Sequence, residues 1–163
     1  MTGSPRLRLL VDTNVWLDNY DDTRATSRVS REFLNVACEC EAELLYSMTS
    51  IKDLYYLLAR RLKVEARQAH GRLTEQDVRV AEAYARACVD NVADAATCIA
   101  TDVSDLWLAR KYQAVHGDLE DCLIMAAAKR AGSDYVVTND ARFLRQSMVP
   151  VLSPEQMIAL LHA

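Results

Sequence analysis

The chain has 163 residues, of which 51% are hydrophobic and 26% charged, with only four glycines and three prolines. This composition supplies enough apolar material for the core of one domain, and it excludes a disordered protein. The formal net charge of −4 argues against a protein that binds nucleic acid through a bulk positive field. The longest uncharged apolar run, residues 122–128, is far shorter than the roughly 20 residues of a membrane span.

Residues 1–8 carry no apolar segment like that of a signal peptide, so we expect a cytoplasmic protein. The five cysteines are an odd number without a Cys-x-x-Cys pair. We expect them to be small buried hydrophobic residues in a reducing compartment rather than metal ligands or redox groups. No repeat or linker interrupts the chain, and we predict a single domain over residues 1–163.

The first apolar run ends abruptly at an acid. Leu9, Leu10 and Val11 are continuous rather than alternating, which is typical of a strand buried on both faces. Asp12 follows directly. In open α/β sheets, ligands bind in the crevice at the carboxyl ends of the strands. Asp12 is therefore the first candidate for chemistry.

The rest of the chain alternates between helical and strand patterns. We expect helices over residues 14–20 and 27–41, a strand over 44–48, helices over 50–63 and 74–91, a strand over 97–101, helices over 102–115 and 118–131, a strand over 135–137, a short helix over 142–146, an edge strand over 149–152 and a terminal helix from 153. Strands separated by helices predict a parallel sheet with helices on both faces.

Four carboxylates stand at comparable places in this pattern. Two come at the ends of strands and two near the start of a helix that follows a strand or loop: Asp12, Asp140, Asp53 and Asp121. Because the carboxyl ends of parallel strands share one edge, and the following helices begin there, the four acids are expected to converge on one pocket.

Such a cluster needs counter-charge. Two carboxylates 4 Å apart repel by about 4 kcal/mol at an effective dielectric constant near 20. No Lys or Arg lies within the five residues before Asp121, and the bases nearest to Asp140 are Arg142 and Arg145. Ligands that are all oxygen suit Mg²⁺ or Mn²⁺ better than Zn²⁺. The pattern therefore predicts a site for a hard divalent cation.

Each acid also has a simpler interpretation. Asp53 and Asp121 fit the third position of capping boxes that begin at Ser50 and Asp118, and the other two acids fit ordinary turns. Four coincidences are needed for these interpretations to hold together, so we favour the common pocket.

Asp118, Glu120 and the three histidines are further polar side chains that could take part in the chemistry. Asp118 lies on the same helical face as Asp121, and we expect a helix cap, with a supporting role in the pocket as the alternative. Glu120 is expected to be solvated. The histidines at 70, 116 and 162 fall in loops or the tail, and we do not expect a catalytic base among them.

Four motifs in this order resemble the PIN-domain family of metal-dependent ribonucleases, which includes VapC-type toxins of toxin-antitoxin systems. The motifs are LLVDTNVWLD (9–18), TSIKDLYYLL (49–58), DLEDCLIMAAAKRAGSDYVVTND (118–140) and ARFL (141–144). The resemblance implies a five-stranded parallel sheet in a three-layer α/β/α sandwich. It also implies a carboxylate pocket that holds Mg²⁺ or Mn²⁺ and hydrolyses RNA phosphodiester bonds.

The resemblance assigns roles to single residues. The family's four acids map onto Asp12, Asp53, Asp121 and Asp140; we expect the first, third and fourth to hold the metal. Asn14 and Thr138 match polar positions that orient these acids or the attacking water. The second acid is usually Glu in the family, and the shorter Asp53 is expected either to reach the metal through water or to position the nucleophile.

Substrate and partners can be predicted only in outline. Arg142 and Arg145 are the best candidates for RNA contacts. Other bases gather at 60, 61, 63, 67, 129 and 130, where they form either a phosphate-binding rim or solvated helix ends. An antitoxin protein is a possible partner. Apolar faces over residues 29–40, 53–62 and the terminal helix suggest a homodimer.

Two rival functions were considered. A haloacid-dehalogenase-type phosphatase also begins with a strand followed by Asp, but its chemistry needs a second Asp where this chain has Asn14. A PIN-like module that binds RNA or protein without cleaving it is the other alternative; retention of all four acids argues against it.

Overall fold

The computed structural model describes residues 6–163. Its five strands form one sheet in the order β3-β2-β1-β4-β5. They are β1 (Arg8–Val11), β2 (Glu43–Ser47), β3 (Thr97–Ile99), β4 (Tyr135–Val137) and β5 (Val151–Leu152). Every neighbouring pair is parallel. The predicted five-stranded parallel sheet is confirmed, and its strands end at a common edge.

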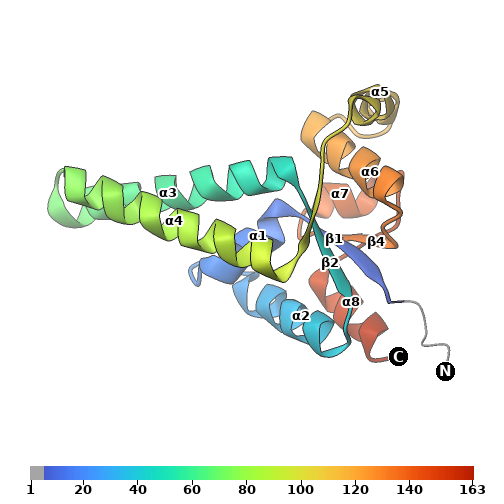
Figure 1. Ribbon diagram of the computed structural model, residues 1–163, viewed down its shortest axis with the longest axis horizontal. Helices are drawn as coiled ribbons and strands as arrows, with labels where there is room; N and C mark the ends of the chain where they lie inside the picture. The colour runs from blue at the N-terminus through green and yellow to red at the C-terminus, as the bar shows by residue number, and fades with distance from the viewer. Residues whose placement is uncertain (1–5) are drawn as a thin grey trace.

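Helices cover both faces of this sheet. They are α1 (Thr13–Tyr20), α2 (Ser27–Glu39), α3 (Met48–His70), α4 (Glu75–Ala95), α5 (Val103–Tyr112), α6 (Leu119–Ala131), α7 (Ala141–Arg145) and α8 (Pro154–Leu161). In Figure 1, α5, α6 and α7 lie on one side of the sheet, and α1, α2 and α8 lie on the other. The fold is therefore the three-layer α/β/α sandwich that the sequence predicts.

The central strand β1 explains why its apolar run is continuous. Leu9 and Val11 are fully buried in one hydrophobic cluster, which includes Phe33 of α2. Leu10 faces the other cluster, where it packs with Phe143 of α7. Successive side chains of a strand point to opposite faces. Both faces of β1 are covered, so no position in the run is left for a polar residue until Asp12.

The α3–α4 pair is a long helical hairpin that extends away from the sheet (Figure 1). The sequence predicts that the first of these helices ends near residue 63, but α3 continues to His70 and ends at Gly71. Its leucine stripe stops at Leu62, and beyond that point α3 is held by contacts with α4, such as the 2.7 Å ion pair between Lys63 and Glu82. Tertiary packing thus prolongs the helix past its apolar pattern.

The start of α3 also differs from the prediction. Ser47, not Ser50, is the N-cap, and its Oγ accepts a hydrogen bond from the Ser50 amide at 3.1 Å. The predicted capping box between Ser50 and Asp53 is therefore wrong, and Asp53 has no capping role. At the start of α4, by contrast, Thr74 and Asp77 do form a capping box, because both of its reciprocal hydrogen bonds are present.

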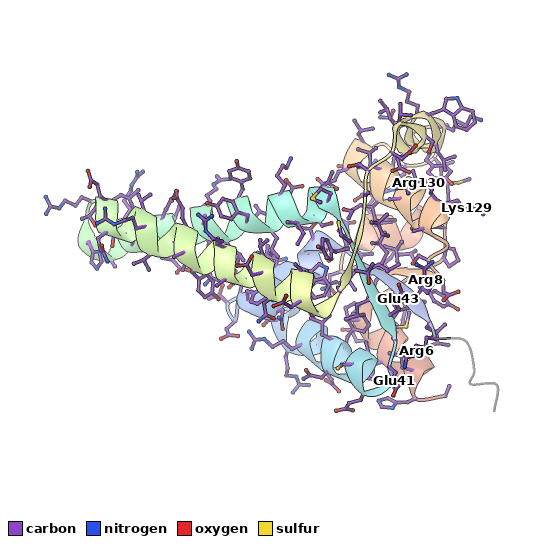
Figure 2. The ribbon with its side chains drawn as sticks, in the orientation of Figure 1. Arg6, Arg8, Glu41, Glu43, Lys129 and Arg130 are labelled. Atoms are coloured by element: carbon purple, nitrogen blue, oxygen red, sulfur yellow. The ribbon has the colours of Figure 1, made fainter. Side chains whose placement is uncertain are left out.

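Ion pairs occupy the edge where β1 and β2 begin, opposite the edge where they end. Arg8 Nε lies 2.8 Å from Glu43 Oε2, and Arg6 Nη2 lies 2.7 Å from Glu41 Oε2 (Figure 2). Pairs this exposed to solvent contribute little to stability. They balance the charge at the amino ends of the strands.

Two other predictions concern surfaces. The apolar faces of α2 and α8 pack into the molecule's own core, where Phe33 and Met157 belong to the same buried cluster. Large apolar side chains are exposed on α3, where Tyr56 is 63% exposed, and on α8, where Leu160 is 39% exposed. The homodimer stays a prediction. Cys88 and Cys122 are buried as expected, whereas the other free cysteines are partly or fully exposed.

No helix within residues 6–163 combines the length and the apolar character that crossing a membrane requires.

Candidate active site

A cleft of about 570 Å³ lies at the carboxyl ends of the strands. Six carboxylate side chains line it: Asp12, Asp53, Asp118, Glu120, Asp121 and Asp140. The four acids that the sequence predicts to converge are all among them. The sheet places them there because Asp12 follows β1 directly and Asp140 comes three residues after β4, while Asp53 lies in the second turn of α3 and Asp121 in the first turn of α6.

Asp12 is the most buried of these acids, with 5% of its surface exposed. It is the N-cap of α1, and its Oδ1 accepts a hydrogen bond from the amide of Thr13 at 2.6 Å. Its Oδ2 accepts hydrogen bonds from Asn14 Nδ2 at 2.6 Å and from the Thr138 hydroxyl at 2.7 Å. Asn14 and Thr138 therefore hold the Asp12 carboxylate in one orientation.

The same two side chains tie the end of β4 to α1. Asn14 Oδ1 accepts a hydrogen bond from the Asn139 amide at 2.9 Å, and Thr138 Oγ1 accepts one from the Asp140 amide at 3.0 Å. Asp12 and Asp140 are thus positioned relative to each other through shared partners.

Asp140 and Asp118 are helix caps as well as cleft residues. Asp140 Oδ1 accepts hydrogen bonds from the amides of Arg142 and Phe143, at 2.7 and 2.9 Å. Asp118 Oδ1 accepts one from the Glu120 amide at 2.8 Å. Carboxylates at helix N-termini are stabilised by the helix dipole. The predicted cap at Asp118 is confirmed, and it still lines the cleft.

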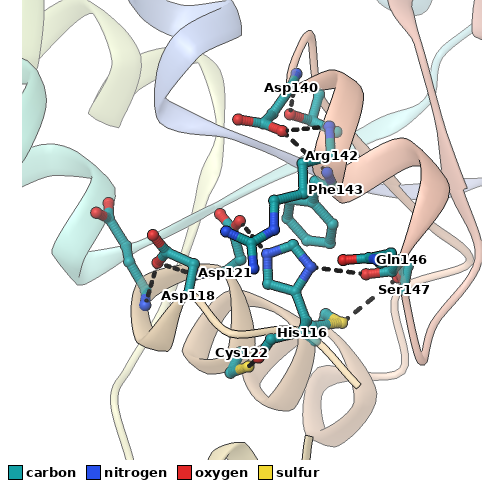
Figure 3. Close-up of polar contacts among 12 residues, drawn as sticks. His116, Asp118, Asp121, Cys122, Asp140, Arg142, Phe143, Gln146 and Ser147 are labelled. Atoms are coloured by element: carbon teal, nitrogen blue, oxygen red, sulfur yellow. Dashed lines mark hydrogen bonds and ion pairs between the residues drawn. The ribbon is translucent and has the colours of Figure 1, made fainter. Parts of the chain in front are cut away.

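Asp121 contacts a histidine that the sequence analysis set aside. The His116 ring is fully buried; its Nδ1 lies 2.9 Å from the Gln146 carbonyl oxygen and its Nε2 lies 2.6 Å from Asp121 Oδ2 (Figure 3). A carbonyl can only accept, so Nδ1 carries a hydrogen, and the short contact on the other side requires a proton between Nε2 and Oδ2. His116 therefore fixes the orientation of Asp121.

Glu120 is exposed to solvent, as predicted, and it also lines the cleft. Burial and the neighbouring Asp53 raise the pKa of Glu120 to about 7, with smaller contributions from Asp12 and Asp118. Asp53 itself lies beside Lys52, whose Nζ is 3.2 Å from Asp53 Oδ1. Asp53 and Glu120 thus form a second pair of acids at this cleft.

The electrostatics of the cleft indicate missing positive charge. The pKa of Asp12 is raised to about 6: burial is the largest cause, the hydrogen bonds from Thr138 and Thr13 oppose it, and the charges of Asp121 and Asp140 add to it. Burial also raises the pKa of Asp121, although His116 opposes the shift. Each shift disfavours the charged carboxylate that a cation would stabilise.

The donor atoms suit a hard cation, but the side chains do not form a coordination sphere as they stand. Asp121 Oδ1 and Asp140 Oδ2 accept no hydrogen bond from the described residues, so an oxygen of each remains for a ligand. However, no group of three or more His, Cys, Asp or Glu within residues 6–163 is arranged to hold a metal ion. The donor atoms of these side chains are all oxygens, which is the chemistry that Mg²⁺ and Mn²⁺ prefer.

Arg142 and Arg145, predicted to contact RNA, lie outside the residues that line the cleft. Arg142 extends toward Gly117, where a Cβ would come within 2.8 Å of its Nη2 (Figure 3). Gly117 thus leaves room for this guanidinium beside the His116 loop. The RNA-binding role of both arginines stays a prediction.

Comparisons with solved structures find the same fold. VapC20 of Mycobacterium tuberculosis, a sarcin-ricin loop cleaving toxin, superposes with a TM-score of 0.59 at 15% identity, over 84% of this chain and 93% of that one. VapBC2 of Rickettsia felis, bound to a DNA fragment from its promoter, superposes with a TM-score of 0.56 at 13% identity, over 90% of this chain and 98% of that one. PAE2754 of Pyrobaculum aerophilum superposes with a TM-score of 0.56 at 18% identity, over 99% of this chain and 94% of that one.

A search of curated proteins finds no match. The family model of the PIN domain, in contrast, matches residues 9–147, a span that begins in β1 and includes every acid of the cleft. The sheet order, the position of the acids and this match agree, and the chain belongs to the PIN domain family.

Proposed function

We propose that the protein is a ribonuclease that hydrolyses RNA phosphodiester bonds with the help of Mg²⁺ or Mn²⁺. The observation that carries this proposal is the convergence of six carboxylates on one cleft, with the buried Asp12 at its base. Burying Asp12 among like charges is costly. A divalent cation that enters with the substrate offsets this cost.

Asp12, Asp121 and Asp140 would hold the cation. When bound, Mg²⁺ or Mn²⁺ supplies a Lewis acid that polarises the phosphoryl group and lowers the pKa of water. Asn14 and Thr138 keep the Asp12 carboxylate oriented, and His116 does the same for Asp121. With the acids held in place, little reorganisation is needed when the substrate binds.

Asp53 and Glu120 are suited to work on the attacking water. A general base must lie within reach of the water whose proton it takes, and both side chains line the cleft. Burial and Asp53 also raise the pKa of Glu120 while the cleft holds no cation. We propose that this pair orients the water and accepts its proton. The short side chain of Asp53 matters less in this arrangement, because Glu120 reaches the same part of the cleft.

Family membership and the two VapC neighbours support a toxin-antitoxin role. VapC20 is a sarcin-ricin loop cleaving toxin, and VapBC2 was solved bound to a DNA fragment from its promoter. We propose that this chain is likewise a toxin with a protein antitoxin as its partner. Co-purification of a small protein expressed from an adjacent reading frame would test the pairing.

The activity is tested with a mixed pool of single-stranded and structured RNA and Mn²⁺. We expect cleavage by the wild-type protein, loss of cleavage on adding a chelator, and loss in both Asp12→Asn and Asp121→Asn. Asp90→Asn, which removes an exposed acid on α4, is the matched control and should cut normally. Equal cleavage by all variants would point to a contaminating nuclease. RNA binding without cleavage would support the non-catalytic alternative, and release of phosphate from phosphomonoesters would support a phosphatase.

A further inference from the structure

One positive side chain lies in the acidic cleft. Among the residues that the structure describes, Arg24 is the sole Lys, Arg or His in the cleft lining. It lies in the connection between α1 and α2, and 35% of its side chain is exposed. Arg24 falls in a polar connection outside the four motifs, so the sequence pattern does not indicate its place in the cleft.

Arg24 is held by a carboxylate that is itself fully buried. Its Nε donates a hydrogen bond to Asp18 Oδ1. Asp18 is 0% exposed, and its Oδ2 accepts hydrogen bonds from the Ser30 hydroxyl and from Asn139 Nδ2, each at 2.7 Å. Asp18 therefore has fixed partners on both oxygens, and it constrains the guanidinium that it pairs with.

A chain of hydrogen bonds connects this guanidinium to the acid at the base of the cleft. Asn139, which binds Asp18 through its side chain, donates its amide hydrogen to Asn14 Oδ1 at 2.9 Å. Asn14 Nδ2 in turn donates to Asp12 Oδ2 at 2.6 Å. These polar contacts define the position of Arg24 relative to Asp12. A buried network of hydrogen bonds is rigid when its members have partners.

Only one edge of the guanidinium is used in this arrangement. Asp18 engages Nε, and within residues 6–163 neither Nη atom of Arg24 has a hydrogen-bond partner. A guanidinium presents its donors in a planar fork that matches two oxygens of a phosphate. Arg24 needs only its Nε to pair with Asp18. Its two Nη groups are therefore left to bind another partner in the cleft.

We propose that Arg24 binds a phosphate of the RNA next to the bond that is cut, with Asp18 and Asn139 holding it in register with Asp12. The inference rests on the ribonuclease activity proposed above. It makes Arg24 the substrate-binding residue of the cleft and Asp18 its positioning residue. An acidic pocket repels a polyanion, so a fixed cation at its wall favours one placement of the strand.

The test uses the native chain, a fluorogenic single-stranded RNA and Mn²⁺, and it measures KM and kcat over a series of salt concentrations. Arg24→Gln should raise KM by about tenfold or more, since hydrogen bonds between charged groups are the strong ones, with kcat nearly unchanged. The slope of log KM against log salt should fall by about 0.7, as expected for the loss of one phosphate contact on a single strand. Arg24→Lys should retain the slope with a smaller rise in KM.

Two controls separate binding from folding. Arg28→Gln removes an equal charge from an exposed position four residues further on, in the first turn of α2, and it should leave KM and the slope unchanged. The double variant Asp18→Asn with Arg24→Gln removes both charges, so no buried carboxylate is left unpaired. It should melt near the wild-type temperature and still have the raised KM.

The outcomes are distinct. If the double variant regains the wild-type KM, Arg24 acts only through Asp18 and the inference is overturned. It is also overturned if Arg24→Gln has the wild-type KM while the wild-type protein cleaves. If the wild-type protein cuts no RNA, the proposed ribonuclease fails and this inference fails with it.

Discussion

Asp21 and Arg61 form an ion pair that joins the loop after α1 to the middle of α3. Arg61 Nη1 lies 2.5 Å from Asp21 Oδ1, with 7% of the acid's side chain and 26% of the arginine's exposed. Asp21 also accepts hydrogen bonds from Thr23, from its amide at 3.0 Å and its hydroxyl at 2.6 Å. Burial alone would raise the pKa of Asp21, but the contacts with Thr23 and Arg61 outweigh it, and the pKa lies below its ordinary value.

A lowered pKa in the folded state makes this pair's contribution depend on pH. The contribution is fully present above the unfolded-state pKa of about 4, and it is lost as the pH falls through the lower, folded-state pKa. We expect Asp21→Asn to reduce the free energy of unfolding by roughly 1–2 kcal/mol at neutral pH, less than for a fully buried pair because Arg61 is partly exposed. The loss should shrink progressively in acid.

Urea unfolding of wild type and Asp21→Asn at neutral and acidic pH measures this difference. Asp22→Asn is the matched control, because the Asp22 side chain is 79% exposed, and it should change stability little at either pH. If Asp21→Asn lowers the free energy of unfolding equally at both pH values, the pKa of Asp21 is not lowered by the pair with Arg61.

His116 and Glu120 show what residue patterns cannot reveal. The acids at 12, 53, 121 and 140 were found because each follows a strand or begins a helix, which are features of the local sequence. His116 lies in the loop before Gly117, and nothing in that loop indicates that its ring is fully buried against Asp121. The one usable signal was a histidine five residues before an acid, across a glycine that permits a turn.

At the scale of elements, the predictions hold where several local signals coincide. The helices at 74 and 118 begin where predicted, because a capping side chain, an acidic first turn and an apolar pattern agree. For α3, both Ser47 and Ser50 are suitable caps, and the sequence cannot choose between them. Pairing of β2 with its neighbours extends to Ser47, and this fixes the cap one turn earlier than the pattern suggests.

The tip of the α3–α4 hairpin gives a prediction at this scale. Gly71 ends α3 with φ of +72°, and a Cβ placed there would contact nothing within 4 Å. Any cost of Gly71→Ala therefore comes from the left-handed backbone alone, roughly 1 kcal/mol. Gly71→Asn should cost less, because Asn tolerates this conformation better than Ala.

Urea unfolding followed by circular dichroism measures both costs. Gly132→Ala is a useful comparison, since its φ is +65° and the nearest atom to an added Cβ, Arg8 Nη1, is at an ordinary contact distance of 3.5 Å. It should be destabilised to a similar extent. A Gly71→Asn protein less stable than Gly71→Ala would rule out backbone strain as the cause.

For the whole molecule, the sheet separates charge between its two ends. Arg8 with Glu43 and Arg6 with Glu41 balance each other where the strands begin, whereas six carboxylates share one cleft where the strands end. The topological rule for parallel sheets was enough to predict that Asp12, Asp53, Asp121 and Asp140 meet. It could not predict which side-chain oxygens point inward, because these depend on partners from other elements.

This concentration of charge predicts that a divalent cation stabilises the fold. Asp12 is buried beside like charges that raise its pKa, so the native state is under electrostatic stress that binding relieves. A ligand at a hundred times its dissociation constant adds about 2.7 kcal/mol to the free energy of unfolding. For a chain of this size that corresponds to a rise of roughly 5–10 °C in the melting temperature.

Calorimetric scans with increasing Mn²⁺ should therefore show a rising Tm that a chelator reverses. Asp12→Asn removes a buried charge, but it also replaces one acceptor oxygen with an NH2 donor. Its Tm is therefore compared with and without Mn²⁺, and it should gain much less from the cation than the wild type does. Asp90→Asn carries the same change in net charge on exposed α4, and it should respond to Mn²⁺ as the wild type does. If Asp12→Asn and Asp90→Asn gain equally, the stabilisation comes from general screening of a protein of net charge −4 rather than from a cation held in the cleft.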